Sequence, residues 1–582
     1  MLFNNQEYFK GFLITNKYLH DIDGINLVIG SMHVKLDNDL AHFEFIGERH
    51  LILLGYAMDT HRPDDSELDI LKALSRSDDH QFVTLLNRMN GRYILLCTDG
   101  DEVKIYPDAT TMRPLFYHRE ACVLASHAKL VADVTMSYFN QNVSEHQKVK
   151  GYLDMTRFAD IYKLNCNHYF DMTAHQTVRF YPSDSYSERT LSEVLEQTLR
   201  LFDNQKQWLQ YKDKYMTLTA GIDSRVSMAL LHDRTLPYLT YISTNSQMTD
   251  FAKHAYKFDE LIVKEMVEDL ALNHTFFSIH SKGAPTSYEH ALYNQCESLH
   301  NADLSYQLAH SEFKGKLHIK SSLFGMAKLP MAESFYSSNE QQMIESLILK
   351  KQPEGTKYLE PEQLLQSFLE RAQYNTKGFY LTDLYFQETR LANWHSNNTQ
   401  ETDNSVEVFI LVNTREFMNL FASMPLAVRN SGQLHREWIN HLWPVLNFYS
   451  VNGDFTLFES FKSFKENSSK QHLSITGSNI SIQNNKIIPN FPMNQTRYTF
   501  NVANNSDERM TVLVQTAYNN PSGRGSIHLV TATKIIDYLD LNSGVTIILN
   551  PGDNFEAHIQ YKKLNESLSW QRAGELTIKQ TT

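Results

Sequence analysis

The 582-residue sequence predicts a multidomain protein of mixed α/β and α+β class, built from three successive parts. Short apolar strands separated by turn residues dominate residues 1–185. Helices and strands alternate through residues 186–465, and strands of alternating apolar and polar residues fill residues 473–582. A chain of this length can bury several hydrophobic cores, which agrees with three domains.

The first part reads as a layered α+β domain. Segments 51–56, 93–97 and 103–106 are short and apolar, and Asp99–Gly100 indicates a hairpin turn. A single helix, predicted at about 64–90, interrupts the strands. Strands in succession with few helices are typical of an α+β layer arrangement.

The second part predicts a doubly wound parallel sheet. A helix at 191–202 precedes an apolar strand at 215–218, and a new helix begins near Val226. Further strands are predicted at 238–243, 275–279 and 317–321, with a helix at 259–272, and residues 340–465 read as helical. In such sheets, ligands bind at the carboxyl ends of the strands, where Thr219–Ser224 and Ser243–Asn245 lie.

The third part, residues 473–582, predicts an antiparallel β-sandwich, with Asn-rich and Pro-Gly turns between its strands. Such a domain can bind a partner or a polymer, or it can simply cap an interface. The sequence leaves these alternatives open, and it leaves open whether the chain forms a homodimer.

Composition narrows the classes of function. The chain is 42% apolar and 21% charged, and its net charge of −13 argues against non-specific binding to nucleic acid or to an anionic membrane. The four cysteines show no C-x-x-C spacing, which predicts buried thiols in a reducing compartment. The N-terminus has no signal-peptide pattern and no apolar segment is long enough to span a membrane, so we expect a cytoplasmic protein.

Thr219–Ser224, with the sequence Thr-Ala-Gly-Ile-Asp-Ser, is the most informative stretch. A strand, a loop of small residues and a helix N-terminus form an anion site, because unpaired N–H groups and the positive helix end point at one place. The hydroxyls of Thr219 and Ser224 add donors, and Asp223 can hold a magnesium ion. The alternative is an ordinary strand-to-helix turn.

This stretch resembles the Ser-Gly-Gly-x-Asp-Ser pyrophosphate loop of the asparagine-synthetase-like ATP pyrophosphatases. Thr219 stands at the first Ser and Ala220 at the first Gly, whereas the last Gly, Asp and Ser match. A methyl group at Ala220 would approach the phosphate, and a positive φ would be strained there. The resemblance implies ATP and Mg²⁺ as cofactors. The implied ligands are Leu218, Thr219, Ala220, Gly221, Asp223, Ser224, Ser243, Ser322 and Gly325, with Asp223 as the metal ligand.

The segment after the fourth strand departs from that family. The family has Ser-Gly-Glu-Gly-x-Asp-Glu there, and this chain has Lys320–Gly325, with the sequence Lys-Ser-Ser-Leu-Phe-Gly. Ser322 and Gly325 are the remnants of the motif, and Lys320 or Lys328 is a candidate phosphate contact. The missing acidic pair removes metal ligands.

The first part resembles a class II glutamine amidotransferase domain, which has an Ntn-type layered fold. The residues that carry the resemblance are Gly91-Arg92-Tyr93, Asp99, Asp108, Arg113-Pro114-Leu115 and Ala125-Ser126. Members of that family hydrolyse glutamine with an N-terminal Cys, whereas this sequence starts Met1-Leu2-Phe3 and its first Cys is Cys97. We therefore expect a degenerate domain that keeps the fold without the glutaminase.

Together the two resemblances imply an ATP-dependent carbon–nitrogen ligase. A substrate carboxylate would be adenylated with release of pyrophosphate, and an amine that does not come from glutamine would then displace AMP. This logic resembles that of β-lactam synthetases and lasso-peptide cyclases. It suggests specialised biosynthesis of a natural product, a peptide or a surface polysaccharide, from a small-molecule, peptide or saccharide substrate.

Tyr385, Glu388 and Arg390 are the candidate catalytic residues for the amine step. Tyr385 and Glu388 are three residues apart, so on an α-helix they share a face and can serve as the base. Arg390 can bind a carboxylate. The alternative is that Glu388 and Arg390 form a solvated surface pair. Lys462 and Lys465 are weaker candidates for neutralising phosphate.

Two other functions stay open. The chain can be a non-catalytic binding or scaffold protein that descends from the asparagine synthetase fold, a reading that Ala220 and the lost acidic motif favour. It can also catalyse another adenylating reaction, such as thiolation, against which the absence of a suitable Cys pair counts.

Overall fold

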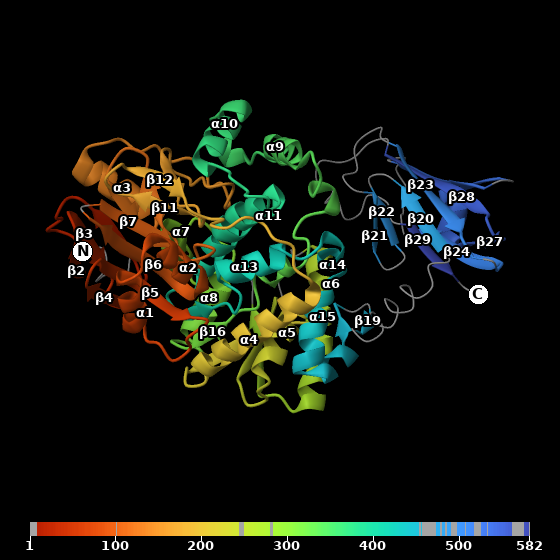
Figure 1. The fold of residues 1–582 in the computed structure, drawn as a ribbon, viewed down its shortest axis with the longest axis horizontal. Helices are drawn as coiled ribbons and strands as arrows, with labels where there is room; N and C mark the ends of the chain where they lie inside the picture. The colour runs from red at the N-terminus through yellow and green to blue at the C-terminus, as the bar shows by residue number, and fades with distance from the viewer. Residues whose placement is uncertain are drawn as a thin grey trace. The chain divides into compact units, whose positions relative to one another are not determined.

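The computed structural model forms two compact units, residues 1–331 with 338–458 and residues 332–337 with 459–582 (Figure 1). The structure describes residues 8–100, 102–243, 249–279, 283–452, 455–456, 473–477, 480–483, 486–489, 497–506, 508–516, 525–531, 534–561 and 576–580. Asn245, Lys462 and Lys465 lie outside these residues.

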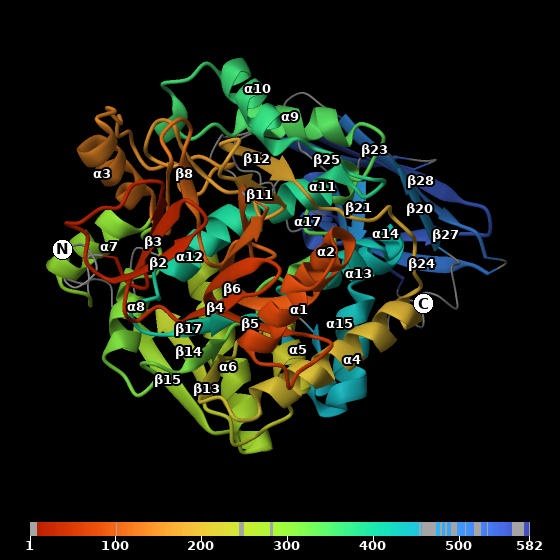
Figure 2. The same ribbon diagram turned by 60° about the vertical axis from the view of Figure 1, so that its left-hand side comes forward.

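Two six-stranded antiparallel sheets build the N-terminal part of the larger unit (Figures 1 and 2). The first, in spatial order, is β10 (Ile161–Lys163), β8 (Phe116–His118), β9 (Val123–Ala125), β1 (Phe12–Thr15), β3 (Met32–Leu36) and β2 (Ile25–Ile29). The second is β12 (Gln176–Arg179), β11 (His168–Asp171), β7 (Glu102–Pro107), β6 (Met89–Asp99), β5 (His50–Asp59) and β4 (His42–Ile46).

The two sheets pack face to face, because Phe12 and Val34 of the first share one buried core with Ile52 and Ile94 of the second. Helix α3 (Ala128–Phe139) packs on the other face of the first sheet. Helices α1 (Glu67–Ser75) and α2 (Asp79–Arg88) pack on the other face of the second. The sequence predicted one helix here. The chain breaks it in two, because the Asp78 side chain caps α2 by accepting the Gln81 N–H.

A five-stranded parallel sheet forms the second layer system of this unit, in the order β15 (His274–Ile279), β14 (Tyr238–Ser243), β13 (Lys214–Thr217), β16 (Leu317–Ile319) and β17 (Glu407–Phe409). From β13 the chain adds β14 and β15 on one side, and it then crosses to add β16 and β17 on the other. The order therefore reverses between β13 and β16, and ligands of parallel sheets bind at such a reversal. Strand β17 lies in a region that the sequence predicted as helical. Three residues are too short to show a period.

Helices lie between and after these strands along the chain. Those between β12 and β15 are α4 (Leu191–Leu209), α5 (Ile222–Leu231) and α6 (Asp250–Leu270), of which α4 and α5 pack with α15 (Gln433–Leu442). The others are α7 (Thr286–Gln295), α8 (Ala302–Ala309), α9 (Glu340–Lys350), α10 (Pro361–Ala372), α11 (Leu381–Tyr385), α12 (Ser396–Gln400), α13 (Arg415–Ala422) and α14 (Leu426–Ser431). A π-helical segment, η4 (Phe386–His395), joins α11 to α12.

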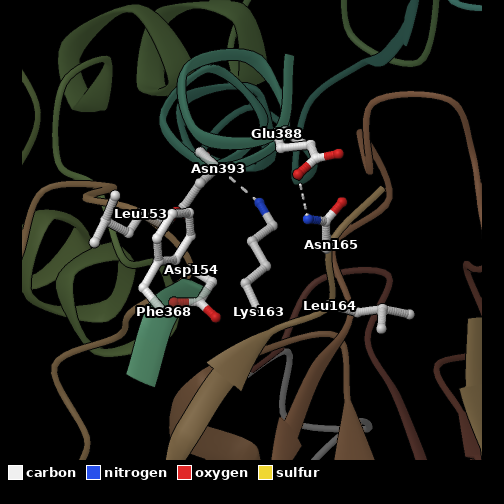
Figure 3. Close-up of a pocket in the computed structure, with 9 residues that line it drawn as sticks. Leu153, Asp154, Lys163, Leu164, Asn165, Phe368, Glu388 and Asn393 are labelled. Atoms are coloured by element: carbon white, nitrogen blue, oxygen red, sulfur yellow. Dashed lines mark hydrogen bonds between the residues drawn. The ribbon is translucent and has the colours of Figure 1, made fainter. Parts of the chain in front are cut away.

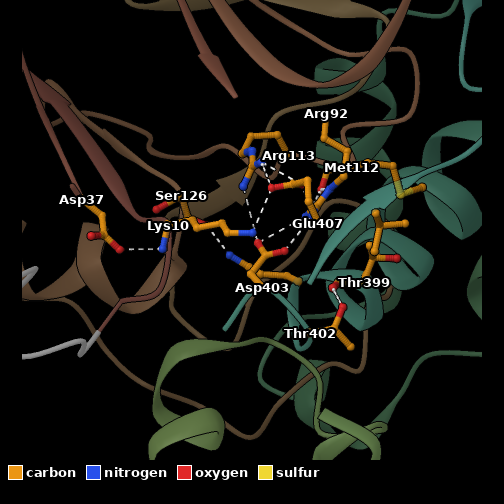
Figure 4. Close-up of polar contacts among 12 residues, drawn as sticks. Lys10, Asp37, Arg92, Met112, Arg113, Ser126, Thr399, Thr402, Asp403 and Glu407 are labelled. Atoms are coloured by element: carbon orange, nitrogen blue, oxygen red, sulfur yellow. Dashed lines mark hydrogen bonds and ion pairs between the residues drawn. The ribbon is translucent and has the colours of Figure 1, made fainter. Parts of the chain in front are cut away.

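Polar contacts join the antiparallel layers to β17 and to Ile410, the residue after it. The Tyr56 hydroxyl donates to the Val408 carbonyl at 2.6 Å, and the Asn90 side-chain amide donates to the Ile410 carbonyl at 3.0 Å. Beside them lies a charge cluster of Lys10, Arg92, Arg113, Asp403 and Glu407 (Figure 4).

In this cluster Arg92 contacts Asp403 Oδ1 and Glu407 Oε1, both at 2.7 Å, and Lys10 contacts Glu407 at 3.0 Å. Burial acts to raise the pKa of Glu407, but Arg113, Lys10 and Arg92 outweigh it and hold the pKa well below the usual carboxyl range. The cluster therefore keeps Glu407 ionised in the interior.

The smaller unit contains two five-stranded antiparallel sheets. The first is β20 (Leu473–Gly477), β23 (Arg497–Asn504), β28 (Asn554–Tyr561), β25 (Gly525–Val530) and β26 (Ile535–Asp537). The second is β21 (Ile480–Gln483), β22 (Lys486–Pro489), β29 (Leu576–Gln580), β24 (Met510–Thr516) and β27 (Val545–Leu549). Phe500 and Ile559 of the first share a buried core with Val512 and Ile578 of the second.

Two smaller observations bear on the sequence predictions. Cys97, Cys166 and Cys296 are buried free thiols, and Cys122 is half-buried. In the described part of the chain, no helix combines the length and the apolar character needed to cross a membrane.

Candidate functional site

A cavity of about 320 Å³ opens where the order of the parallel strands reverses. The segments after β13 and β16 line it, together with the N-terminus of α5, Tyr241 of β14 and Asn452. Its lining includes Thr219, Gly221, Asp223, Ser224 and Ser322 of the sequence-predicted ligand residues. The strand–loop–helix stretch therefore lies at the position where a parallel sheet binds a ligand.

The first turn of α5 presents backbone donors to this cavity. Gly221 is the N-cap, with φ −74° and ψ 155°, and the helix begins at Ile222. The N–H groups of Ile222, Asp223 and Ser224 have no acceptor within the helix, since the first turn of any α-helix leaves its donors unpaired. With the positive end of the helix dipole, they favour an anion.

Hydrogen bonds within the loop fix its shape. The Thr219 N–H donates to Ser224 Oγ at 3.1 Å, and the Gly221 N–H donates to Thr219 Oγ1 at 3.2 Å. The Ala220 N–H donates to Asp259 Oδ1 of α6 at 2.7 Å. Three loop amides therefore bond to the protein itself, and the donors left for an anion are those of the α5 first turn.

Ala220 and Leu218 do not line the cavity. The expected strain at Ala220 was wrong, because Ala220 does not belong to the residues with positive φ, and its side chain is 1% exposed in the core. Leu218 is fully buried and its carbonyl accepts from Thr240 Oγ1 at 2.7 Å. Both residues support the loop from behind.

The remaining predicted ligands fall in different places. Ser322 lines the cavity beside Ser321, whose buried hydroxyl has no hydrogen-bond partner among the described residues. Gly325 lies in a short 3-10 turn and is absent from the lining. Ser243 ends β14 and is absent from it as well.

Two lysines bring positive charge to the cavity. Lys328 Nζ lies 3.1 Å from Asp223 Oδ1, and His435 Nε2 of α15 lies 3.4 Å from the same oxygen. Burial acts to raise the pKa of Asp223, but His435 and Lys328 outweigh it and hold the pKa far below the usual range. Lys320 follows β16, and its ammonium has no hydrogen bond or ion pair within the described residues.

The residues present do not fit a magnesium ion held by the protein. Of the described residues that line the cavity, Asp223 alone is acidic, and Lys328 already neutralises it. No group of three or more His, Cys, Asp or Glu side chains that could hold a metal ion occurs in the part of the chain that the structure describes. Magnesium requires oxygen ligands, and lysines exclude it.

The predicted catalytic residues lie on the α11–η4 segment. The π-helical geometry of η4 changes the spacing that the sequence argument assumed, because i, i+3 contacts belong to an α-helix. Glu388 accepts from Arg179 at 2.8 Å and from Asn165 and Asn167 at 2.7 Å. Its side chain is 1% exposed, so the solvated surface pair with Arg390 is wrong.

Glu388 lines a second cavity of about 10 Å³, which has room for one water molecule (Figure 3). Arg390 lies over the Trp394 ring at 3.6 Å, and Tyr385 is buried, which raises its pKa to about 12. The structure therefore places the three residues on one segment without a shared site.

Three residues of the site were missed in the sequence. Asp259 holds the Ala220 amide, His435 contacts Asp223, and Asn452 donates its N–H to the Ala220 carbonyl at 3.2 Å. Each lies dozens to hundreds of residues from the loop in the sequence, so no local pattern of residues predicts its contact with the loop.

The charge of Lys320 gives the site a pH dependence. Burial lowers the pKa of Lys320 to about 8, although Glu401 acts against it. A lysine with a lowered pKa loses its proton as the pH rises through that value, so we expect anion affinity to fall between pH 7 and 9. Calorimetric titration of sulfate over this range should show the fall, and Lys320→Met should remove it. An equal slope in both proteins would contradict this assignment.

Comparison with known proteins gives weak likenesses only. No family model and no curated protein matches the chain. The solved structure of the allosteric regulatory enzyme of purine biosynthesis matches at 13% identity and a TM-score of 0.20, over 42% of this chain. The match spans 62% of that enzyme, less than two thirds of its length. NMN synthetase from Francisella tularensis matches at 17% identity and a TM-score of 0.19, over 36% of this chain and 97% of that one. Glutamine phosphoribosylpyrophosphate amidotransferase from B. subtilis matches at 10% identity and a TM-score of 0.20, over 73% and 90% of the two chains.

Proposed function

We propose that this protein is an ATP-dependent carbon–nitrogen ligase that releases AMP and pyrophosphate. The observation that carries the proposal is the cavity at the strand reversal, which is lined by the first turn of α5 and by Lys320, whose ammonium has no hydrogen bond or ion pair among the described residues. Backbone donors and fixed positive charge are what a leaving pyrophosphate needs.

In the first step, a substrate carboxylate oxygen attacks the α-phosphorus of ATP, and the bond from that phosphorus to the bridging oxygen of pyrophosphate breaks. The negative charge that develops on the pyrophosphate would be stabilised by the N–H groups of residues 222–224, by the Thr219 hydroxyl and by Lys320. An amine nitrogen then attacks the acyl carbon, the bond from carbon to the AMP oxygen breaks, and the amine loses a proton.

The α11–η4 segment is the proposed location of the amine step. The Arg390 guanidinium lies over the Trp394 ring at 3.6 Å and makes no ion pair with a described carboxylate. It is the proposed partner of a substrate carboxylate, with Tyr385 and Glu388 on the same segment. We propose a small-molecule, peptide or saccharide substrate of specialised biosynthesis.

The first test is binding of ATP, measured by calorimetry and thermal shift. At a hundredfold excess over Kd, bound ATP should stabilise the protein by about 2.7 kcal/mol. Thr219→Val removes a loop hydroxyl that lines the cavity, and we expect it to weaken binding about tenfold. Thr235→Val, on the exposed turn before β14, is the matched control and should leave binding unchanged. No saturable binding at millimolar ATP would contradict the ligase.

Release of pyrophosphate decides between two functions once ATP binding is established. A ligase releases pyrophosphate when offered its carboxylate. A non-catalytic binding protein derived from the same fold is the second candidate, favoured by the ion pair that Asp223 makes with Lys328 in the cavity. Bound ATP that no class of carboxylate turns over would support this second function.

A further inference from the structure

We propose that this cavity holds phosphate groups with Lys320 and Lys328, without a magnesium ion bound to the protein, and that Lys328 exchanges Asp223 for the incoming anion. The inference rests on the proposed function and specifies how its site recognises a diphosphate or triphosphate. Three features of the cavity carry it.

The first feature is the balance of charge. The described residues that line the cavity include two lysines and one carboxylate. Because Asp223 is paired with Lys328, the positive charge of Lys320 is left without a counter-ion in the lining. A site that bound its ligand through a divalent ion would need the opposite balance, with carboxylate oxygens around the metal. The cavity attracts an anion directly.

The second feature is the state of Lys320 and Ser321. The Lys320 ammonium has no partner within the described residues, although its backbone N–H is fixed to the Phe409 carbonyl at 2.9 Å. The next residue, Ser321, carries a buried hydroxyl that also has no partner there. A buried hydroxyl without a partner costs free energy, which a phosphate that bonds to Ser321 and pairs with Lys320 would recover.

The third feature is that the Asp223–Lys328 pair is partly open to solvent. The two side chains are 36% and 34% exposed, so water can reach both charges when Lys328 turns away from Asp223. The backbone of Lys328 is held at both ends, because its N–H donates to the Gly325 carbonyl and its carbonyl accepts from Arg429. Only the side chain has to move.

His435 makes the exchange possible. It is fully buried on α15, and its Nε2 lies 3.4 Å from the same Asp223 oxygen that Lys328 contacts. When Lys328 turns to a phosphate, Asp223 keeps a neighbour that can donate a hydrogen bond. Asp223 is therefore the internal counter-ion of the site, and it competes with the ligand for Lys328.

Two readings of Asp223 predict opposite effects of Asp223→Asn. If Asp223 competes with the anion, removing its charge frees Lys328 and tightens pyrophosphate binding, by about fivefold. If Asp223 holds a metal ion, the same variant weakens binding, and wild-type binding requires the metal. Lys320→Met should weaken pyrophosphate binding about tenfold or more, because a charge-assisted hydrogen bond is lost.

The experiment is calorimetric titration of inorganic pyrophosphate into the full-length protein in excess EDTA, and again with magnesium chloride. We expect wild-type binding in EDTA, tighter binding by Asp223→Asn and weaker binding by Lys320→Met. Lys314→Met, an exposed lysine, is the matched control and should bind like the wild type. Melting temperatures show that each variant is folded.

Pyrophosphate binding that needs magnesium and is weakened by Asp223→Asn would overturn the inference while leaving an ATP-dependent ligase intact. Pyrophosphate binding in EDTA together with failure to bind ATP under any condition would overturn the proposed ligase and leave the lysine site standing. Absence of pyrophosphate binding in both buffers would overturn the inference.

Discussion

Replacing Arg92 with methionine lowers the free energy of unfolding of the larger unit by about 3–5 kcal/mol. Arg92 is 1% exposed, and it contacts both acidic residues of the cluster that joins β6 to β17. Without it, Asp403 keeps Arg113 at 3.6 Å as its one remaining cation in the cluster, and it stays buried. A buried charge without a close partner is among the most costly defects a fold can carry.

Urea unfolding of wild type and variant measures this loss. Arg62→Met is the matched control, because Arg62 is 66% exposed and lies 3.9 Å from Asp65. A surface pair of this kind contributes about 0–1 kcal/mol. If Arg92→Met cost no more than the control, the cluster would not hold the two layer systems together.

Glu388→Gln should destabilise the same unit by about 3 kcal/mol or more, because it leaves the guanidinium of Arg179 buried without its counter-ion. Arg179 donates to both carboxylate oxygens of Glu388, at 2.8 and 3.0 Å, and its side chain is 7% exposed. Glu370→Gln, on the exposed face of α10, changes the same chemical group and should leave stability unchanged.

Kinetics of the same variant separate two roles of Glu388. A base in the amine step contributes about 10²–10⁴ to the rate, so a catalytic Glu388 requires kcat to fall by that factor at a temperature where the variant is folded. An unchanged kcat with a lowered melting temperature would assign Glu388 to positioning the η4 segment alone. The stability loss is expected in either case.

The sequence predicts those features that depend on neighbouring residues. The strand before Thr219, the small residues of the loop and the helix after Gly221 are local patterns, and the structure places them at the cavity. The alternating apolar residues of β23 and β24 are local as well, and they predict antiparallel strands.

The sequence does not predict contacts between residues that are far apart in the chain. Tertiary packing brings three side chains to the loop from separate parts of the chain. They are the Asp259 carboxylate, the His435 imidazole and the Lys328 ammonium. The π-helical turn of η4 leaves no period in the sequence. The same limit concealed the partner of Glu388, since Arg179 lies 209 residues away.

The position of β17 gives the antiparallel N-terminal layers a task that needs no active site of their own. β17 is the outermost strand of the parallel sheet, and such a margin is a template for aggregation when it faces water. Here Tyr56 and Lys10 bond to the carbonyls of Val408 and Val406, at 2.6 and 3.2 Å, and thereby cover it. The N-terminal layers thus shield the border of the parallel sheet from water, and a chain trimmed to that sheet and its helices would leave the border unprotected.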